Sequence, residues 1–129
     1  MARWLIIGPV AVVCFDTLAS IAARSLDFDY GSLWPLSILL TVGIAFLAGR
    51  DTGSTRVGVL AGLALAFADA TVGWTVSWLI GPGAPTAADR DALTVAVTAW
   101  GVTALGAIEG LLGGWLGARR TSNWPLQPT

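Results

Sequence analysis

Four long stretches of this sequence are almost free of charge. One of them, residues 30–49, contains no charged side chain, and each of the other three contains one acidic residue. Because about 20 mainly apolar residues cross the hydrocarbon core of a bilayer as a helix, each stretch is long enough to span a membrane once. The four stretches are residues 4–23, 30–49, 57–88 and 92–118.

The polar breaks between these stretches set the boundaries of the predicted helices. Residues 50–55 form a short polar turn, and Gly81 and Pro82 interrupt the third stretch. We therefore predict an all-α membrane protein, a four-transmembrane-helix bundle. Its helices are expected over residues 4–24, 33–49, 56–80 and 91–118, to within a few residues.

The composition leaves little chain for anything outside the membrane. Hydrophobic residues make up 55% of the 129 residues, charged residues make up 12%, and the mean hydropathy is +0.74. An average soluble domain carries roughly 25% charged residues. A soluble domain, a nucleotide-binding fold and a nucleic-acid module are therefore not expected. We predict one integral membrane domain over residues 1–129, with a short C-terminal tail over 121–129.

Cysteine and histidine usage narrows the chemistry. The chain has no His and a single Cys, Cys14, so an internal disulfide, a Cys/His zinc site and a His-ligated haem are excluded. We expect Cys14 to be a buried small hydrophobic residue. No cofactor and no metal site is expected. An enzyme is not expected either, because no nucleophile and base can be paired in the sequence.

The arginines predict how the helices are oriented. With four spans, both termini and the turn over residues 50–55 share one side of the membrane. That side carries five arginines, Arg3, Arg50, Arg56, Arg119 and Arg120, while the other side carries Arg24 and Arg90. Positive charge in short loops marks the cytoplasmic side. We therefore expect a multi-pass protein of a bacterial plasma (inner) membrane with cytoplasmic N- and C-termini.

The outer loops are rich in acidic residues. Thr86 and Asp89 have the spacing of a helix capping box, and Asp91 also lies near the start of the last predicted helix. We expect Asp89 and Asp91 to act as helix caps. In the alternative, these two residues form an acidic outer vestibule together with Asp27 and Asp29.

A weak internal repeat is visible. Residues 13–17 resemble residues 66–70, which aligns Asp16 with Asp69, and residues 45–50 resemble residues 114–119. Each half would form one helical hairpin. The sequence therefore admits two tandem helical hairpins in a parallel repeat, although matches this short also arise by chance.

Three acidic residues lie inside the predicted spans. Asp16 and Asp69 lie roughly 18 Å along their helices from the cytoplasmic end, and Glu109 lies roughly 14 Å from that end. An ionisable group at this depth costs about 2.5–3.5 kcal/mol on insertion scales. No Lys, Arg or His in the spans can pair with them. The three acids are therefore expected to be protonated, to share protons or to hold a cation.

Small residues accompany these acids at helical spacing, which predicts that the carboxyl groups face other helices rather than lipid. Two roles remain open. The acids form hydrogen bonds between tightly packed helices, or they form a proton or cation site, the usual role of acids inside a membrane. The stripes are Pro9, Asp16, Ser20 and Ala23; Gly62, Ala66, Asp69, Gly73 and Ser77; and Gly106, Glu109, Gly113 and Gly117.

Two tryptophans lie deeper than the tryptophans near the predicted membrane surfaces. Trp74 and Trp100 are roughly 9–12 Å below the outer surface by helical rise. There they can line or gate the acid site, since an aromatic face attracts a cation, or they can simply pack in the core or against lipid. Ser20 is a further candidate lining residue, one helical turn from Asp16.

The leading functional hypothesis is proton- or cation-linked transport or conduction, with Asp16, Asp69 and Glu109 as the ion- or proton-binding residues. The alternative is a non-transporting accessory or assembly subunit that packs on a larger membrane partner. The glycine-lined helix faces exceed what one bundle needs, so a homo-oligomer is expected. The other partners expected are the lipid bilayer and a proton or small cation, and no nucleic acid.

Overall fold

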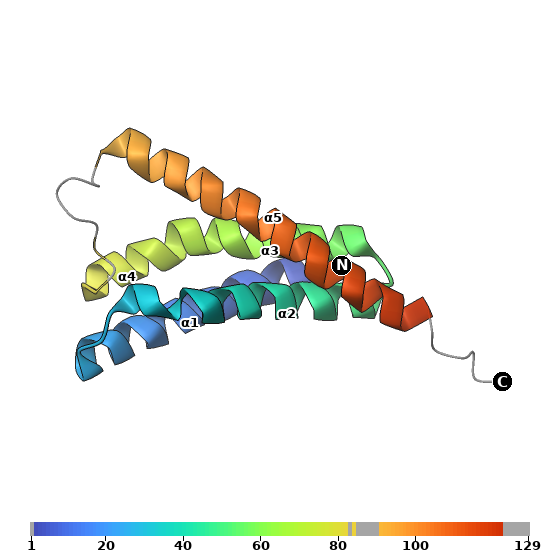
Figure 1. The fold of residues 1–129 in the computed structure, drawn as a ribbon, viewed down its shortest axis with the longest axis horizontal. Coiled ribbons are helices and arrows are strands. Elements are labelled where there is room, and N and C mark those ends of the chain that lie inside the picture. The colour runs from blue at the N-terminus through green and yellow to red at the C-terminus, as the bar shows by residue number, and fades with distance from the viewer. Residues whose placement is uncertain (1, 83, 85–90, 123–129) are drawn as a thin grey trace.

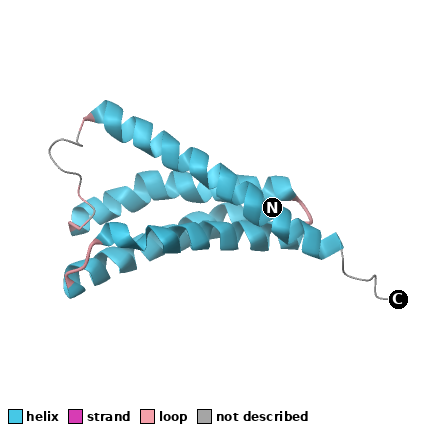
Figure 2. Cartoon of the chain, in the orientation of Figure 1, coloured by secondary structure: helices cyan, strands magenta, loops and turns pink. Residues whose placement is uncertain are grey.

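A computed structural model describes residues 2–82, 84 and 91–122. Helices make up nearly all of this part of the chain, and four of its helical segments are long and apolar enough to span a membrane (Figure 2). The predicted fold class is confirmed. In chain order the elements are α1 (Trp4–Leu26), the 3-10 helix η1 (Tyr30–Leu33), α2 (Trp34–Thr52), α3 (Thr55–Ala68), the π-helical turn η2 (Asp69–Gly73), α4 (Trp74–Ile80) and α5 (Ala92–Ser122).

The chain crosses the length of the bundle four times. The N-terminus, the turn between α2 and α3 and the C-terminal end of α5 lie together at one end, and the turn between α1 and α2 lies at the other (Figure 1). We call the first the Arg-rich end, because it carries the arginines at positions 3, 50, 56, 119 and 120. The opposite end, which the arginine count predicts to face outward, is called the outer end. The predicted tail over 121–129 lies outside the described residues, except for the helical positions 121 and 122.

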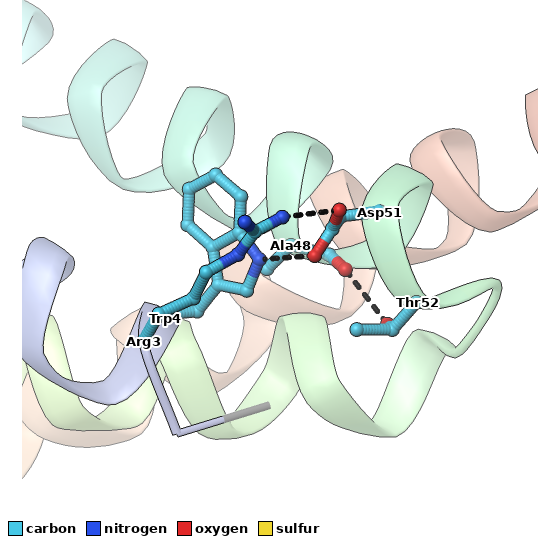
Figure 3. A network of polar contacts seen from close by, with 5 residues as sticks. All are labelled: Arg3, Trp4, Ala48, Asp51 and Thr52. Atoms are coloured by element: carbon cyan, nitrogen blue, oxygen red, sulfur yellow. Dashed lines mark hydrogen bonds and ion pairs between the residues drawn. The ribbon is translucent and has the colours of Figure 1, made fainter.

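Polar contacts at the Arg-rich end tie the start of α1 to the end of α2 (Figure 3). Asp51 forms an ion pair with Arg3 and accepts a hydrogen bond of 3.0 Å from the indole N–H of Trp4. Gly53 then ends α2 in the left-handed conformation, with φ of 64°, which glycine adopts without steric cost. These contacts fix the turn that starts α3 beside α2.

Helix α5 packs against α3 through glycine. A Cβ atom added at Gly62 would lie 2.7 Å from the Cα of Gly110, and one added at Gly114 would lie 2.8 Å from the Cα of Gly58. Backbones approach this closely only where side chains are absent, as in small-residue contacts between membrane helices. The predicted small-residue packing is confirmed. These glycines are used within one chain, however, so they give no support to the expected homo-oligomer.

The core is made of small residues and the surface of large ones. Leu65 and Val12 are the largest apolar side chains that are fully buried, whereas many Leu, Ile and Trp side chains are exposed. Cys14 is also exposed, so the prediction that it is buried was wrong. The reason is its position on α1, because Cys14 lies one turn from exposed Val10 and one turn from exposed Leu18, on a stripe that faces outward.

The two predicted hairpins pack differently. Helices α3 and α5 are in extensive contact, while α1 lies mainly against α3 and α4 and touches α2 only lightly. Helix α5 stays close to α2 and α3 over its C-terminal half and diverges from α4 towards the outer end (Figure 1). The parallel repeat therefore remains a prediction, and the opening between α5 and α4 is a feature of the second hairpin alone.

Candidate functional site: a buried pair of carboxyl groups

Asp16 lies on the buried side of α1, in the middle of the helix. Only 2% of the residue is exposed. Its Oδ1 atom accepts a hydrogen bond of 3.1 Å from the hydroxyl group of Tyr30. Its Oδ2 atom is fully buried and accepts no hydrogen bond. Asp16 therefore faces protein, as its small-residue stripe predicted, and keeps one carboxyl oxygen without a donor.

Asp69 comes to the same place from the other side of the interface. It begins the π-helical turn η2 and is half-buried. A Cβ atom added at Gly73 would collide with Oδ2 of Asp16 and would lie 3.2 Å from Oδ1 of Asp69. The carboxyl groups therefore meet beside Gly73, close enough to share a hydrogen bond when one of them carries a proton. Asp16 and Asp69, which the suggested repeat aligns with each other, are therefore neighbours in space.

The π-helical turn was not predicted. An uninterrupted helix was expected over residues 56–80, but the N–H of Trp74 bonds to the carbonyl of Asp69, five residues earlier. Such turns insert a residue into a helix, turn the following residues about its axis and occur often at functional sites. Gly73, the last residue of this turn, and Ser77 of α4 are both buried. The apolar pattern gives no sign of it.

Aromatic side chains surround the carboxyl pair. A cavity of about 140 Å³ opens between α1, η1, the start of α2 and the η2–α4 segment. Both carboxyl groups border it, and so does Trp74, a predicted lining residue. The remaining lining residues are Phe15, Tyr30, Gly31, Leu33, Trp34 and Ser37. Aromatic rings beside carboxylates make this a site suited to positive charge.

A second cavity, of about 200 Å³, lies on the other side of Asp69. It holds Glu109 of α5, which is half-buried and lies beside Thr41 and near Asp69. Asp69, Trp34 and Ser37 border both cavities. Asp16 and Asp69 thus form a close pair, and Glu109 lies on the other side of Asp69. Within the described part of the chain they do not form a three-residue cluster of the kind that holds a metal ion.

The other candidate residues occupy different places. Ser20 is fully buried, and its hydroxyl oxygen has no hydrogen-bond partner. Trp74 packs near Trp78, with ring centroids 6.2 Å apart, and lines the first cavity. Trp100 is 75% exposed and borders a separate pocket, between Phe67 and Thr103, that contains none of the three acids. The structure therefore places Trp74 beside the carboxyl pair and Ser20 one turn after Asp16 on the buried side of α1, while Trp100 lies elsewhere.

Tyr30 is a site residue that the sequence did not reveal. We placed it in an outer loop before the second helix, but η1 begins there and turns the side chain towards Asp16. The available signal was weak, since Tyr30 is the only Tyr in the chain. A Tyr near a membrane surface usually indicates an interfacial anchor. Its position in the sequence therefore does not predict a hydrogen bond with Asp16.

The acids at the outer end serve as local caps. Asp91 accepts hydrogen bonds from the backbone N–H and hydroxyl of Thr94, at 3.0 and 3.1 Å. These bonds lower the pKa of Asp91. Asp29 accepts a hydrogen bond from the backbone N–H of Gly31 at the start of η1. Asp27 ends α1 in the left-handed conformation. Asp89 and its predicted capping box lie outside the described residues.

The site combines several properties in one place. It has two adjacent carboxyl groups, a phenol donor, aromatic walls and a third carboxyl group across a second cavity. Arg3 pairs with Asp51 and Arg24 donates to the carbonyl of Ile80, so neither of these arginines neutralises Asp16 or Asp69. Such a site can hold a proton or a cation. No family model, no curated protein and no solved structure matches this chain.

Proposed function

We propose that this protein mediates proton- or cation-linked transport or conduction across a bacterial plasma membrane. Asp16 and Asp69 form the principal binding site, and Glu109 forms a second site. One observation carries this proposal: Asp16 is buried beside Asp69 in the middle of the spans, and its Oδ2 atom has no hydrogen-bond donor unless Asp69 is protonated.

The energetics favour an exchangeable charge at this pair. A charged acid in the middle of a span costs about 2.5–3.5 kcal/mol or more, and two adjacent carboxylates cannot both be charged without a counter-ion. Replacing one Asp with an apolar residue would remove these costs. The site therefore makes more sense as a place where a proton or cation binds and leaves than as packing alone.

The two cavities suggest a route. Asp69 borders the cavity that contains Asp16 and the cavity that contains Glu109. A proton or cation held by Asp16 and Asp69 can then pass to Glu109 without crossing a purely apolar layer. Trp74 lines the first cavity, and in this scheme it controls access to the pair from the outer half of the bundle.

Flux measurements in liposomes test the proposal. The purified protein is reconstituted, and proton movement and the uptake of Na⁺ and K⁺ are followed with and without an imposed pH gradient. We expect flux of at least one ion above that of protein-free liposomes. Asp91→Asn is the matched control, because Asp91 is an exposed cap far from the pair. Absence of flux for every tested ion would refute the proposal.

One observation favours the second candidate, an accessory or assembly subunit. The outer half of α5 makes few contacts with its own bundle, and Leu93, Val97 and Trp100 are all more than 60% exposed. A pocket of about 150 Å³ beside Trp100 separates this half of α5 from α3 and η2. A transmembrane helix of a larger partner, or of a second copy in a homo-oligomer, can occupy that side. Copurification after mild crosslinking shows whether a larger partner or a second copy of this chain is bound.

A further inference from the structure

Two buried serines on adjacent helices, Ser20 and Ser77, lack the hydrogen bond that threonines of these helices form. Threonine hydroxyls in these helices donate to the carbonyl group four residues earlier, as Thr17 does to Val13 at 2.7 Å and Thr75 does to Thr71 at 2.7 Å. Ser20 and Ser77 are at most 1% exposed, yet their hydroxyl oxygens have no hydrogen-bond partner. Such buried polar groups call for an explanation, commonly a bound water or ion.

Two contacts determine how α1 and α4 are aligned. Asp16 of α1 lies against Gly73, and Arg24, two turns further along α1, donates a hydrogen bond of 2.9 Å to the carbonyl of Ile80. On α1, Ser20 lies halfway between Asp16 and Arg24. On α4, Ser77 lies about halfway between Gly73 and Ile80, so the two serines are at the same height on buried faces of adjacent helices.

Further oxygen atoms are nearby. The Tyr30 hydroxyl, which donates to Asp16, also lies beside the Ser77 hydroxyl. Oδ2 of Asp16 has no donor unless Asp69 is protonated, and the two carboxyl groups meet beside Gly73. The seam between α1 and the η2–α4 segment therefore gathers carboxylate, phenol and hydroxyl oxygens.

We propose that this seam is a binding site for a dehydrated alkali-metal cation, with Asp16, Ser20 and Ser77 as its principal ligands and Asp69 beside them as the carboxyl group of the pair that stays protonated. The inference rests on the proposed function and specifies the class of cation. Carboxylate and hydroxyl oxygens are hard ligands that suit such ions. In membrane transporters Na⁺ sites also lie near the bilayer midplane at interrupted helices, where unwound backbone carbonyls coordinate the ion, and the turn η2 interrupts the third span in a comparable place.

The charge and burial of the site argue against divalent ions. Mg²⁺, for example, usually keeps several waters of its own. Here most of the ligands are uncharged hydroxyl groups, and Asp16 and both serines are almost completely buried. A single positive charge balances one ionised Asp of the pair, so the filled site carries little net charge.

Cation binding can be measured without transport. Thermal unfolding of the detergent-purified protein is followed while NaCl replaces choline chloride at constant ionic strength, with LiCl and KCl in parallel, and isothermal titration calorimetry supplies the dissociation constant. We expect at least one alkali cation to raise the unfolding midpoint in a saturable way, because a ligand that binds only the folded state stabilises it. Acidification should weaken binding, because protons compete for the same carboxyl oxygens.

Matched variants locate the ligands. Ser20→Ala and Ser77→Ala should each weaken the binding of the cation by about tenfold, the value of one hydrogen-bond-like interaction with a charged group. Asp16→Asn should abolish it. Thr75→Ala is the control, because Thr75 is exposed on the same helix and its hydroxyl bonds to its own backbone. If one serine variant is poorly folded, the other one supplies the test, because the two serines lie on different helices.

The outcomes separate this inference from the proposed function. Equal unfolding midpoints in choline, Li⁺, Na⁺ and K⁺ salts would overturn the cation site, and so would unchanged affinity in both serine variants. Proton flux without alkali-cation binding would leave the transport proposal standing and remove the cation site. Saturable binding that depends on Ser20 and Ser77, with no flux of any ion, would support the site and contradict transport.

Discussion

Gly73 of η2 lies directly against the carboxyl group of Asp16 on α1, so closely that no side chain fits at position 73. This contact brings a carboxyl group of one helix to the backbone of a π-helical turn, and the same turn begins with Asp69. The position of the carboxyl pair therefore depends on residue 73 having no side chain.

A methyl group at position 73 should disturb the site. In Gly73→Ala the Asp16 carboxyl must move, which breaks its hydrogen bond with Tyr30 and separates it from Asp69. We expect ion flux and alkali-cation binding to fall at least about tenfold, since one charge-assisted hydrogen bond alone is worth about 1.5–3 kcal/mol. Gly101→Ala is the control, because nothing lies within 4 Å of its added Cβ. Equal losses in the two variants would contradict a specific role for Gly73.

The contact between α3 and α5 leads to a stability prediction. Gly110→Ala places a Cβ atom 2.9 Å from the carbonyl oxygen of Gly58 and 3.0 Å from the Cα of Val59. Backbone atoms cannot move aside as side chains do, so the free energy of unfolding should fall by about 1–3 kcal/mol. Gly43→Ala, where the added Cβ has no neighbour within 4 Å, should be neutral or slightly stabilising. Denaturation in mixed micelles measures both.

The sequence predicted much of this arrangement through two signals. Uncharged stretches defined the spans, and the spacing of small residues placed Asp16 and Asp69 on buried faces. Both signals follow from the cost of polar groups in lipid, which constrains composition and periodicity strongly. The spacing also identified Gly62 and Gly106 as part of helix contacts, but it could not show that these two glycines meet each other within one chain.

Other features of the site depend on geometry that the sequence does not encode visibly. The π-helical turn at Asp69 shifts a register that the spacing treated as uniform. Tyr30 reaches Asp16 because η1 extends the second span by one turn towards its start. Glu109 has a calculated depth similar to that of the other acids, but α5 holds it on the far side of Asp69. Depth along a helix does not show which neighbour a side chain meets.

The arginine distribution leads to a topology prediction. Cysteines are introduced singly at Thr52 and at Ala84 in a Cys14→Ser background, since Thr52 lies at the Arg-rich end and Ala84 follows the end of α4. An impermeant thiol reagent should label position 84 in intact cells and position 52 only after the cells are opened, as short cytoplasmic loops are rich in Arg. Labelling of both positions in intact cells would contradict two cytoplasmic termini.

The cap at Asp91 predicts a dependence of stability on pH. Hydrogen bonds from Thr94 lower the pKa of Asp91 from its ordinary value of 3.8. A lowered pKa in the folded state means that the stabilising contribution is complete above about pH 3.8 and is lost as the pH falls through the folded-state value. Asp91→Asn keeps a capping oxygen but does not titrate.

The two proteins should therefore differ most above the unfolded-state pKa of Asp91. Unfolding midpoints of the parent and Asp91→Asn are compared from about pH 6 to about pH 2. We expect the advantage of the parent to shrink on acidification. A difference that is constant across this range would mean that the carboxylate of Asp91 adds nothing to the cap.

The most direct test of the central claim compares ion flux with stability in carboxamide variants of the pair. Asp16→Asn and Asp69→Asn keep the shape of the side chain and its capacity for hydrogen bonds but remove its charge and its exchangeable proton. Flux in liposomes should be lost in both variants, while the unfolding free energy changes by less than about 1 kcal/mol, as is typical of hydrogen bonds between membrane helices. Full flux in both variants would contradict the claim that this carboxyl pair carries the transported charge.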